Sequence, residues 1–234
     1  MKRLFGWLLM LSAAQGAEPD EGRRIEVLIY NYAHVAADVL ARAEGEAGRI
    51  YQRAGIETEW QDCPLSPAEA ERYPACQSLP GPTRFALRLM PRPMAERRKE
   101  DPMVFGFALF PEDGGFGTVV NVYSDRAAEL AKGRESAHAV ILGHLMAHEL
   151  GHLLLGTGSH SQTGLMHVPW HKKELELIAQ GSMMFMPWQA EQIRSQVRER
   201  SAAGRTAQIA TSAAPNSDLH RQREANLSGS LTQP

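Results

Sequence analysis

Three residues in the middle of the chain, His148, Glu149 and His152, have the types and the spacing of the HExxH zinc motif. Residues four apart share one face of a helix, one turn apart, so both imidazoles can bind the same metal ion. The carboxylate of Glu149 then lies beside the first imidazole, where it reaches a metal-bound water instead of the metal. The flanking residues are apolar, and a charged carboxylate in such a helix needs a partner or a chemical task. These residues therefore predict a metal centre with a proton acceptor beside it.

A third protein ligand decides which kind of zinc site this is. A structural site uses four protein ligands, whereas a catalytic site uses three and keeps one position open. Residues 156–160 contain two glycines that permit a sharp reversal of the chain, followed by His160, which we expect to be the third ligand. The competing histidines are His144, His167 and His171. We expect the first of these to be a core residue or a support for the ligands, and the other two to be solvated or supporting.

The segment 148–170, HELGHLLLGTGSHSQTGLMHVPW, resembles the active site of the metzincin zinc peptidases and, within them, of the matrixins. The resemblance rests on the HExxH residues, on the His-Ser pair at 160–161 and on the Gly-Leu-Met triplet at 164–166, which is similar to the tight turn called the Met-turn. Together with an export signal, this sequence pattern is associated with secreted bacterial proteins.

The resemblance implies a role for each matched residue. The ligands of one catalytic Zn²⁺ would be His148, His152 and His160. Glu149 would be the general base in the hydrolysis of a peptide bond, so the partner would be a peptide or protein substrate. Met166 would form an apolar floor under the ion without binding it. Pro169 and Trp170 would line the substrate pocket just beyond the scissile bond, the S1′ pocket.

The spacing departs from the family pattern after the second ligand. His160 follows His152 by eight residues, two more than in the family, and Leu155 stands where the family has glycine. The loop from His160 to Met166 is shorter by the same two residues, so the separation between His152 and Met166 is kept. We therefore expect the helix and the Met-turn to keep their positions, while His160 sits two residues later in the loop that joins them.

Two other functions fit the same motif. In the gluzincin type of HExxH peptidase the third ligand is a glutamate further along the chain, and Glu174 or Glu176 could serve. The chain could also be a zinc-bound binding module without turnover. The presence of Glu149 favours an enzyme, because metal binding alone needs no base.

Residues 1–17 have the three parts of a secretory signal peptide. Two basic residues precede a short apolar run at 4–11, and small residues follow, with cleavage expected after Gly16 or Ala17. The apolar run is too short to span a bilayer. We expect export to the periplasm or out of the cell.

The expected export bears on the state of the two cysteines, Cys63 and Cys76. An exported chain folds in an oxidising compartment, where a pair of thiols at this separation forms a disulfide. We expect one bridge, which would stabilise the fold by roughly 3 kcal/mol.

Apolar patterns along the chain predict an α+β fold with a small mixed twisted sheet, a long helix that carries the zinc motif, and a helical C-terminal subdomain. The resemblance described above implies that this fold is metzincin-like. The predicted strands are 24–30, 56–60, 84–90, 104–110 and 118–123. The predicted helices are 33–54, 125–131, 136–155, 172–179 and 189–201. The peptidase-like domain spans 18–201, and 202–234 is expected to be a flexible polar tail. The strand at 118–123 is the expected sheet edge for an extended substrate.

The composition excludes several classes of protein. With 25 Lys+Arg and 27 Asp+Glu the formal charge is 25 − 27 = −2, which offers no basic footprint for nucleic acid. Hydrophobic residues make up 43% of the chain, enough for a globular core. No apolar run approaches the roughly 18–20 residues that span a bilayer, so no integral membrane segment is expected. The sequence does not indicate an oligomeric state.

Overall fold

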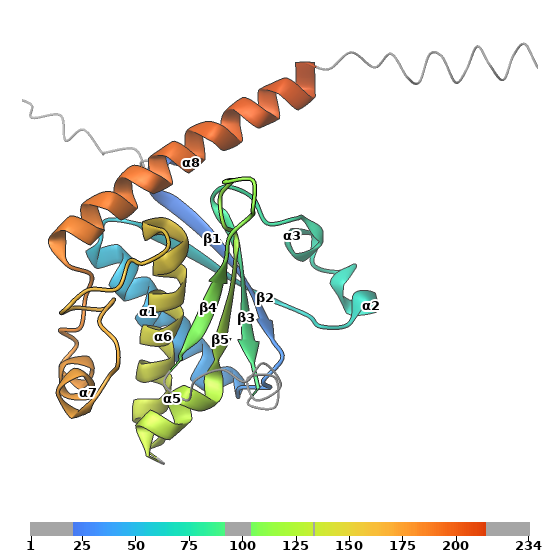
Figure 1. The fold of residues 1–234 in the computed structure, drawn as a ribbon. Coiled ribbons are helices and arrows are strands. Elements are labelled where there is room, and N and C mark those ends of the chain that lie inside the picture. Colours follow the sequence, from blue (N-terminus) through green and yellow to red (C-terminus); the bar gives the residue numbers. More distant parts are fainter. Residues whose placement is uncertain (1–20, 92–103, 133, 214–234) are drawn as a thin grey trace, which may run out of the picture.

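The centre of the fold is a five-stranded sheet in the order β2-β1-β3-β5-β4 (Figure 1). A computed structural model describes residues 21–91, 104–132 and 134–213. The strands are β1 (Arg24–Asn31), β2 (Glu57–Cys63), β3 (Arg84–Met90), β4 (Gly106–Leu109) and β5 (Val119–Tyr123). All neighbouring pairs are parallel except β4 and β5, which are antiparallel. The prediction of five strands in a small mixed sheet is confirmed.

The strand order corrects the expected sheet edge. The glycines before residue 118 and the family resemblance suggest an edge at 118–123, but β5 lies between β3 and β4, so the last strand on that side is β4. The chain reverses direction after β4 ends at Leu109. The next strand, β5, then pairs with β4 on one side and with β3 on the other. Glycines before a strand carry no information about which strands become its neighbours, and the prediction failed for that reason.

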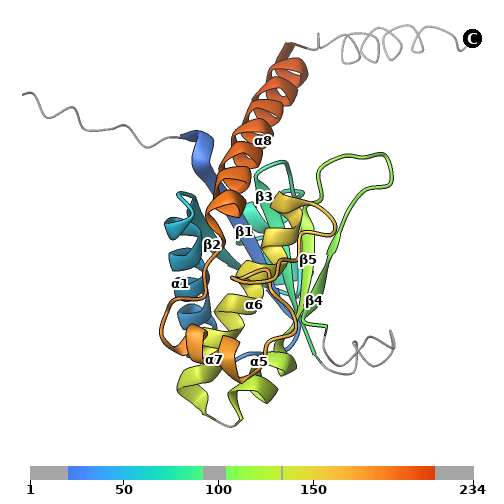
Figure 2. The same ribbon diagram turned by 60° about the vertical axis from the view of Figure 1, so that its left-hand side comes forward.

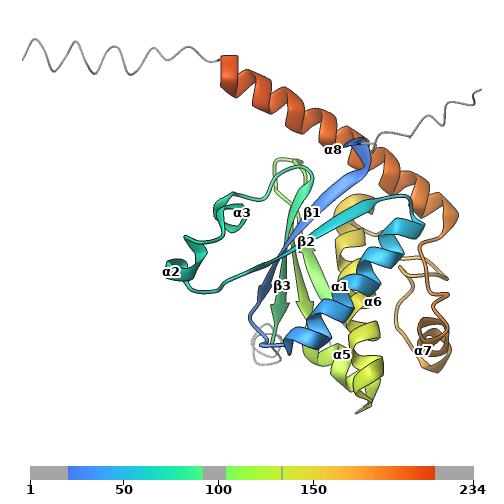
Figure 3. The same ribbon diagram turned by 180° about the vertical axis from the view of Figure 1, so that it is seen from behind.

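Helices α1 (Ala37–Arg53) and α6 (Glu135–Leu155) lie side by side on one face of the sheet (Figures 2 and 3). Their apolar sides and the sheet form one continuous core. The two helices cross closely, because a Cβ atom at Gly143 would lie only 2.5 Å from the carbonyl oxygen of Ala43. A glycine on α6 therefore permits the crossing that fixes the zinc-motif helix against the domain.

Helices also form the part of the chain that follows the zinc motif. They are α7 (Lys172–Ala179) and α8 (Pro187–Ala213), while α5 (Ser124–Ala131) connects β5 to the segment before α6. Helix α8 packs against α6 with its first half, and its last turns extend away from the body of the domain (Figure 1). Among the described residues, no helix is both long and apolar enough to cross a lipid bilayer.

The boundary of the predicted tail is wrong at its start. Residues 202–213 continue α8 as regular helix, so this helix runs beyond residue 201 to Ala213, the last residue that the structure describes. The sequence turns small and polar here, which suggested a loop, but several of these residues are alanines, the best helix formers, and no proline interrupts them. The rest of the expected tail, 214–234, and the expected signal peptide, 1–17, lie outside the described residues.

The expected disulfide between Cys63 and Cys76 is present. It closes the connection between β2 and β3, which contains two short helices, α2 (Pro67–Ala70) and α3 (Pro74–Gln77), that the sequence did not predict. These helices lie on the side of the sheet opposite to α1 and α6 (Figure 1). The hydroxyl of Tyr30 donates to the carbonyl oxygen of Cys76 and ties the bridged segment to β1.

A half-buried carboxyl on α1 makes stability depend on pH. Burial first, and then the nearby Asp62 carboxylate, raise the pKa of Glu44 from 4.5 to about 7. The folded chain then binds this proton more tightly than the unfolded chain does, so stability falls as pH rises between these two values. We expect Glu44→Gln to leave stability unchanged at pH 4 and to add about 1 kcal/mol at pH 8, after allowance for solvent screening. Urea unfolding at both pH values measures the difference.

Glu57→Gln is the matched control for this prediction, because Glu57 is an exposed carboxyl on the neighbouring strand β2. Its effect on the free energy of unfolding should be the same at pH 4 and pH 8. An equal effect of Glu44→Gln at the two pH values would contradict the assignment.

Candidate metal centre

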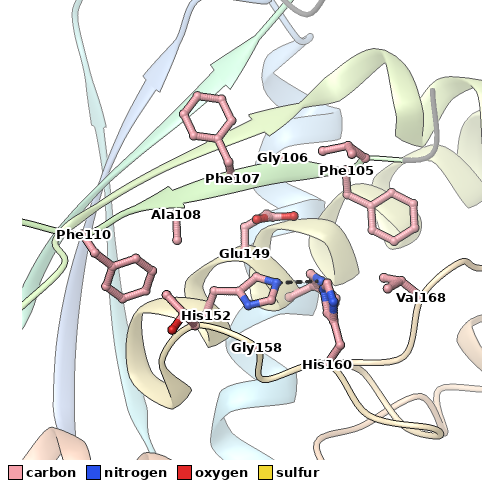
Figure 4. A pocket seen from close by; sticks show the side chains of 13 residues that line it. Phe105, Gly106, Phe107, Ala108, Phe110, Glu149, His152, Gly158, His160 and Val168 are labelled. Carbon is pink, nitrogen blue, oxygen red and sulfur yellow. Dashed lines mark hydrogen bonds between the residues drawn. The ribbon is translucent and has the colours of Figure 1, made fainter. Parts of the chain in front are cut away.

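The structure brings three imidazoles together above one turn of α6. His148 is buried and His152 half-buried on the helix, and His160 reaches them from the loop that follows (Figure 4). One ring nitrogen from each residue lies within 4.8 Å of those of the other two. The Nε2 atoms of His148 and His152 are 3.2 Å apart, close to the about 3.3 Å between two ligand atoms on one tetrahedral Zn²⁺. We call these three residues the triad.

The other ring nitrogens of the two helical histidines are held by hydrogen bonds. His148 Nδ1 lies 2.8 Å from the carbonyl oxygen of Leu165. A carbonyl only accepts, so the proton is on Nδ1 and the Nε2 lone pair of His148 is free to bind a metal. His152 Nδ1 lies 2.9 Å from the Ser159 hydroxyl, which orients the second ring. Orientation of this kind is typical of metal-binding histidines.

The position of His160 follows from how the chain leaves α6. The helix continues to Leu155, and Gly156 then has a φ of +88°, which glycine adopts readily and other residues do not. After the reversal, the amide of Ser161 donates to the carbonyl oxygen of Met166 at 3.0 Å, which closes a compact loop next to His160. The longer spacing to the third histidine is thereby absorbed in the loop, as expected from the kept distance to Met166.

Met166 packs against the turn of α6 that carries His148 and His152. Its side chain is fully buried, and a Cβ atom at Gly151 would lie 2.9 Å from its sulfur. Gly151 stands between the two helical histidines in the sequence, so the thioether packs beneath them. The segment 164–166 is held in place by a further hydrogen bond: the amide of Leu165 donates to the carbonyl oxygen of Met184 at 2.8 Å.

Burial controls the charge of the triad and of its neighbour. Burial, and then the neighbouring His152, lower the pKa of His148 to about 3. Burial, and then His160, lower the pKa of His152 to about 4, and burial also lowers the pKa of His160. All three rings are therefore neutral near pH 7, the form that binds a metal. Burial alone raises the pKa of Glu149 to about 8.

These donors fit a zinc ion. Three neutral imidazoles are a common ligand set of catalytic zinc sites, and a fourth position is left for water or substrate. The carboxyl of Glu149 comes from the residue next to His148 and is fully buried beside the triad. No other group of three or more possible metal ligands occurs among the described residues.

The triad opens into a cleft of about 300 Å³ between α6 and the sheet edge. Strand β4 forms its upper wall, with Phe105 and Val168 at one end and Phe110 at the other (Figure 4). Glu149 lies against β4 at a glycine: a Cβ atom at Gly106 would lie 3.0 Å from the carboxyl carbon of Glu149 and would overlap the backbone of the neighbouring strand. The cleft therefore has an apolar, aromatic rim around the triad and one carboxyl.

The expected substrate-pocket residues lie elsewhere. Pro169 is exposed, and neither it nor Trp170 lines the cleft, whereas Val168 does. Trp170 is 2% exposed and packs behind the cleft wall, with its ring 4.6 Å from Phe105 and 5.9 Å from His148. Its Nε1 donates to the carbonyl oxygen of His167 at 2.6 Å. The direction of the indole depends on the core that it meets, and this core could not be read from its spacing to Met166 in the sequence.

The competing ligand candidates have other partners. His144 is fully buried between α6 and α1, with Nδ1 2.8 Å from the carbonyl oxygen of Val140. His167 Nδ1 lies 3.2 Å from the carbonyl oxygen of Ser161. The structure thus agrees with a core or supporting place for both residues.

The two glutamates of the alternative ligand set lie on α7, away from the triad. Glu174 accepts a hydrogen bond from the amide of His171 at 2.9 Å and so caps the start of that helix. Glu176 is mostly exposed and faces Lys172 at 3.8 Å. Neither joins the triad in the group of possible ligands.

Two residues of the site were missed from the sequence. Ser159 orients His152, and its place directly before the expected ligand was the available signal. Gln189, from α8, is fully buried, and its side-chain amide donates to the Ser161 hydroxyl at 3.2 Å. No local pattern indicated Gln189, because α8 reaches the loop only through the tertiary fold.

Comparison with known proteins adds little to this geometry. No family profile matches the chain, and no curated protein matches it. Among solved structures, the chain is similar to an archaemetzincin from Methanopyrus kandleri, at 15% identity and a TM-score of 0.46, over 77% of this chain and 98% of that one. The roles proposed below therefore rest on the residues of this chain.

Proposed function

We propose that this chain is an exported, metzincin-like zinc endopeptidase. The observation that carries the proposal is the meeting of three neutral imidazoles with one buried carboxyl on the floor of an apolar cleft. The triad is the ligand set, Glu149 is the general base, and Met166 is the apolar support under the site. A pure zinc-binding module would need the imidazoles but not the carboxyl beside them.

Each group of the site has its own task in hydrolysis. A bound Zn²⁺ supplies Lewis-acid chemistry, because it lowers the pKa of water towards 7 and polarises a carbonyl group. Glu149 accepts the proton that water loses as it attacks the carbonyl carbon, and it returns the proton to the departing amine. The hydrogen bond that His148 donates to the carbonyl oxygen of Leu165, and the contact between His152 and the Ser159 hydroxyl, hold the two rings in the orientation that the ligand set requires.

The substrate of this proposal is an extended peptide bound along β4. This strand is the last in the sheet and borders the cleft directly above the triad. A peptide strand added at this edge would obtain backbone hydrogen bonds, and its alternate side chains would point towards the cleft. Three residues of β4 line the cleft: Gly106 and Ala108 are small, and the ring of Phe107 points away from the triad, which leaves room for a second backbone (Figure 4).

Export is part of the same proposal and rests on the sequence at 1–17. The disulfide between Cys63 and Cys76 supports it, since such a bridge persists in an oxidising compartment such as the periplasm or the extracellular medium. Mass spectrometry of the mature N-terminus tests it: a chain that starts after Gly16 or Ala17 is expected, and a chain that retains residue 1 would contradict export.

Metal analysis combined with peptide cleavage tests the ligand set. We expect one zinc per purified chain, cleavage of a mixed peptide library, and loss of cleavage on chelation that zinc restores. His160→Ala should lower zinc affinity about a hundredfold or more, because it removes one of three ligands. His171→Ala is the matched control and should bind zinc like the natural chain.

Other results would favour the competing functions. Loss of zinc in Glu174→Ala or Glu176→Ala, with zinc kept in His160→Ala, would establish a glutamate ligand. Zinc binding without cleavage of any library peptide would establish a binding module. A purified chain without any metal would contradict all three functions.

A further inference from the structure

The third member of the triad is held differently from the other two. His148 and His152 each have a ring nitrogen close to a protein oxygen, whereas the ring of the exposed His160 has no hydrogen-bond partner among the described residues (Figure 4). Two glycines precede it, and a Cβ atom at Gly156 or Gly158 would meet nothing within 4 Å beyond its own chain neighbours. The position of His160 therefore depends on the backbone that follows it.

Ser161, the residue directly after the third ligand, uses all of its polar groups. Its amide donates to the carbonyl oxygen of Met166 at 3.0 Å, and its own carbonyl oxygen lies 3.2 Å from His167 Nδ1. Its hydroxyl donates to the carbonyl oxygen of Thr163 at 2.8 Å and accepts from the side-chain amide of Gln189 at 3.2 Å. Three of these partners lie in the same loop, whereas Gln189 belongs to α8.

Gln189 is part of the start of α8. The helix begins with Pro187, and the side-chain oxygen of Gln189 accepts a hydrogen bond from the backbone amide of Met186 at 2.9 Å. A glutamine at the third position of a helix commonly caps the helix in this way. The Gln189 side chain is fully buried, and a buried amide costs free energy unless its oxygen and its nitrogen are both bonded. The oxygen serves the helix, and the nitrogen serves Ser161.

The donors and acceptors fix the direction of these hydrogen bonds. The backbone amide of Met186 can only donate, so the side-chain oxygen of Gln189 faces it and the NH₂ group faces Ser161. The carbonyl oxygen of Thr163 can only accept, so the Ser161 hydroxyl donates there and accepts from Gln189. A side chain of the same length without an NH₂ group would lose the link between α8 and the loop.

The loop and the segment before α8 are also in close contact beside this link. The amide of Leu165 donates to the carbonyl oxygen of Met184. A Cβ atom at Gly164 would lie 2.9 Å from that oxygen and 3.1 Å from the side chain of Met186. Gln189 extends this contact to the residue that is bonded to the third ligand.

We propose that Gln189 is a positioning residue of the metal centre, which holds His160 at the ion through the Ser161 hydroxyl and so makes α8 part of the zinc site. The inference rests on the ligand set of the proposed function, but its test needs no peptide substrate. The two extra residues before His160 give the loop more freedom, which a hydrogen bond from a fixed helix restricts. Loss of such a support typically weakens metal binding ten- to a hundredfold.

Gln189→Met tests the proposal, because methionine has a similar length and volume but no NH₂ group. The Kd of Zn²⁺, measured by competition with a chelator, should rise at least about tenfold. Ser161→Ala should have a similar effect, and the two substitutions together should add little to either one alone. The matched control is Gln196→Met on the same helix, where the side-chain amide donates to Glu199 at the surface, and it should leave the Kd unchanged.

The His160→Ala background separates support of the ligand from a general structural role. If Gln189 acts through His160, then Gln189→Met should not change the Kd of the site that the two remaining histidines form. An equal rise of the Kd with and without His160 would show a general effect on the fold and would overturn the proposal.

The remaining outcomes keep the inference and the proposed function apart. A Kd in Gln189→Met equal to that of the natural chain overturns the inference and leaves the zinc site intact. A natural chain that does not bind Zn²⁺ overturns the proposed metal centre itself. If Gln189→Met does not fold, Ser161→Ala decides at a half-buried residue, and an unchanged Kd in that variant overturns the inference.

Discussion

Glu149→Gln is expected to lower kcat/KM about a thousandfold while the protein keeps its fold and its zinc. The glutamine side chain has nearly the same shape as the carboxyl, so it fits the same space against Gly106 on β4. It cannot take up the proton that water must lose, and general-base catalysis contributes about a hundred- to ten-thousandfold to reactions of this kind. Progress curves on the best library peptide, with zinc content measured on the same sample, provide the test.

Glu176→Gln is the matched control, because Glu176 is a mostly exposed carboxyl on α7 that faces Lys172. It should retain the activity and the zinc of the natural chain. Activity that survives in Glu149→Gln at more than about a tenth of the natural value would remove Glu149 from the role of base. Loss of zinc from Glu149→Gln would instead indicate that Glu149 is itself a zinc ligand.

The second large effect concerns a buried arginine that holds together the end of the cleft. Arg200, on α8, is 2% exposed. Its Nη1 donates to the carbonyl oxygens of Pro82 and Gly117, and its Nη2 donates to that of Leu153. Burial lowers its pKa to about 10, so the guanidinium remains charged near pH 7. Its guanidinium also stacks on the ring of Phe116 at 4.5 Å.

These contacts join three segments that are far apart in the chain. Pro82 precedes β3, Gly117 lies in the connection between β4 and β5, and Leu153 is in the last turn of α6, next to His152. The positive charge also suits the carboxyl end of α6, where helix carbonyls point outward. The arginine thus fixes the end of the triad helix relative to the connection that follows the sheet edge.

Arg200→Ala is expected to lower the free energy of unfolding by about 4 kcal/mol, because three buried carbonyls lose their donor and a cavity replaces the side chain. Arg200→Lys should recover only part of this loss, since one ammonium group cannot reach both sides of the contact as a guanidinium does. Urea unfolding of the zinc-loaded protein gives the values. Arg198→Ala, at a half-exposed arginine on the same helix, should change stability by less than about 0.5 kcal/mol. Similar losses in both variants would contradict the role of Arg200.

Short-range patterns were enough to predict much of this protein. The spacing of His148 and His152 placed two imidazoles on one helix face, because a helix repeats every 3.6 residues whatever surrounds it. Runs of β-branched residues, alternating apolar residues and a turn signal located the five strands, and the pair of cysteines in an expected oxidising compartment predicted the disulfide. The return of His160 to the helix followed from a glycine that ends α6 and a preserved distance to Met166.

Contacts between distant segments decided the rest. The place of β4 at the sheet edge, the side of the wall on which Trp170 lies, and the anchors from Gln189 and Arg200 all depend on partners that stand far away in the chain. Periodicity records which face of an element is buried, but not which other element covers that face. The candidate ligands could therefore be read from a few neighbouring residues, whereas the shape of the cleft around them required the folded chain.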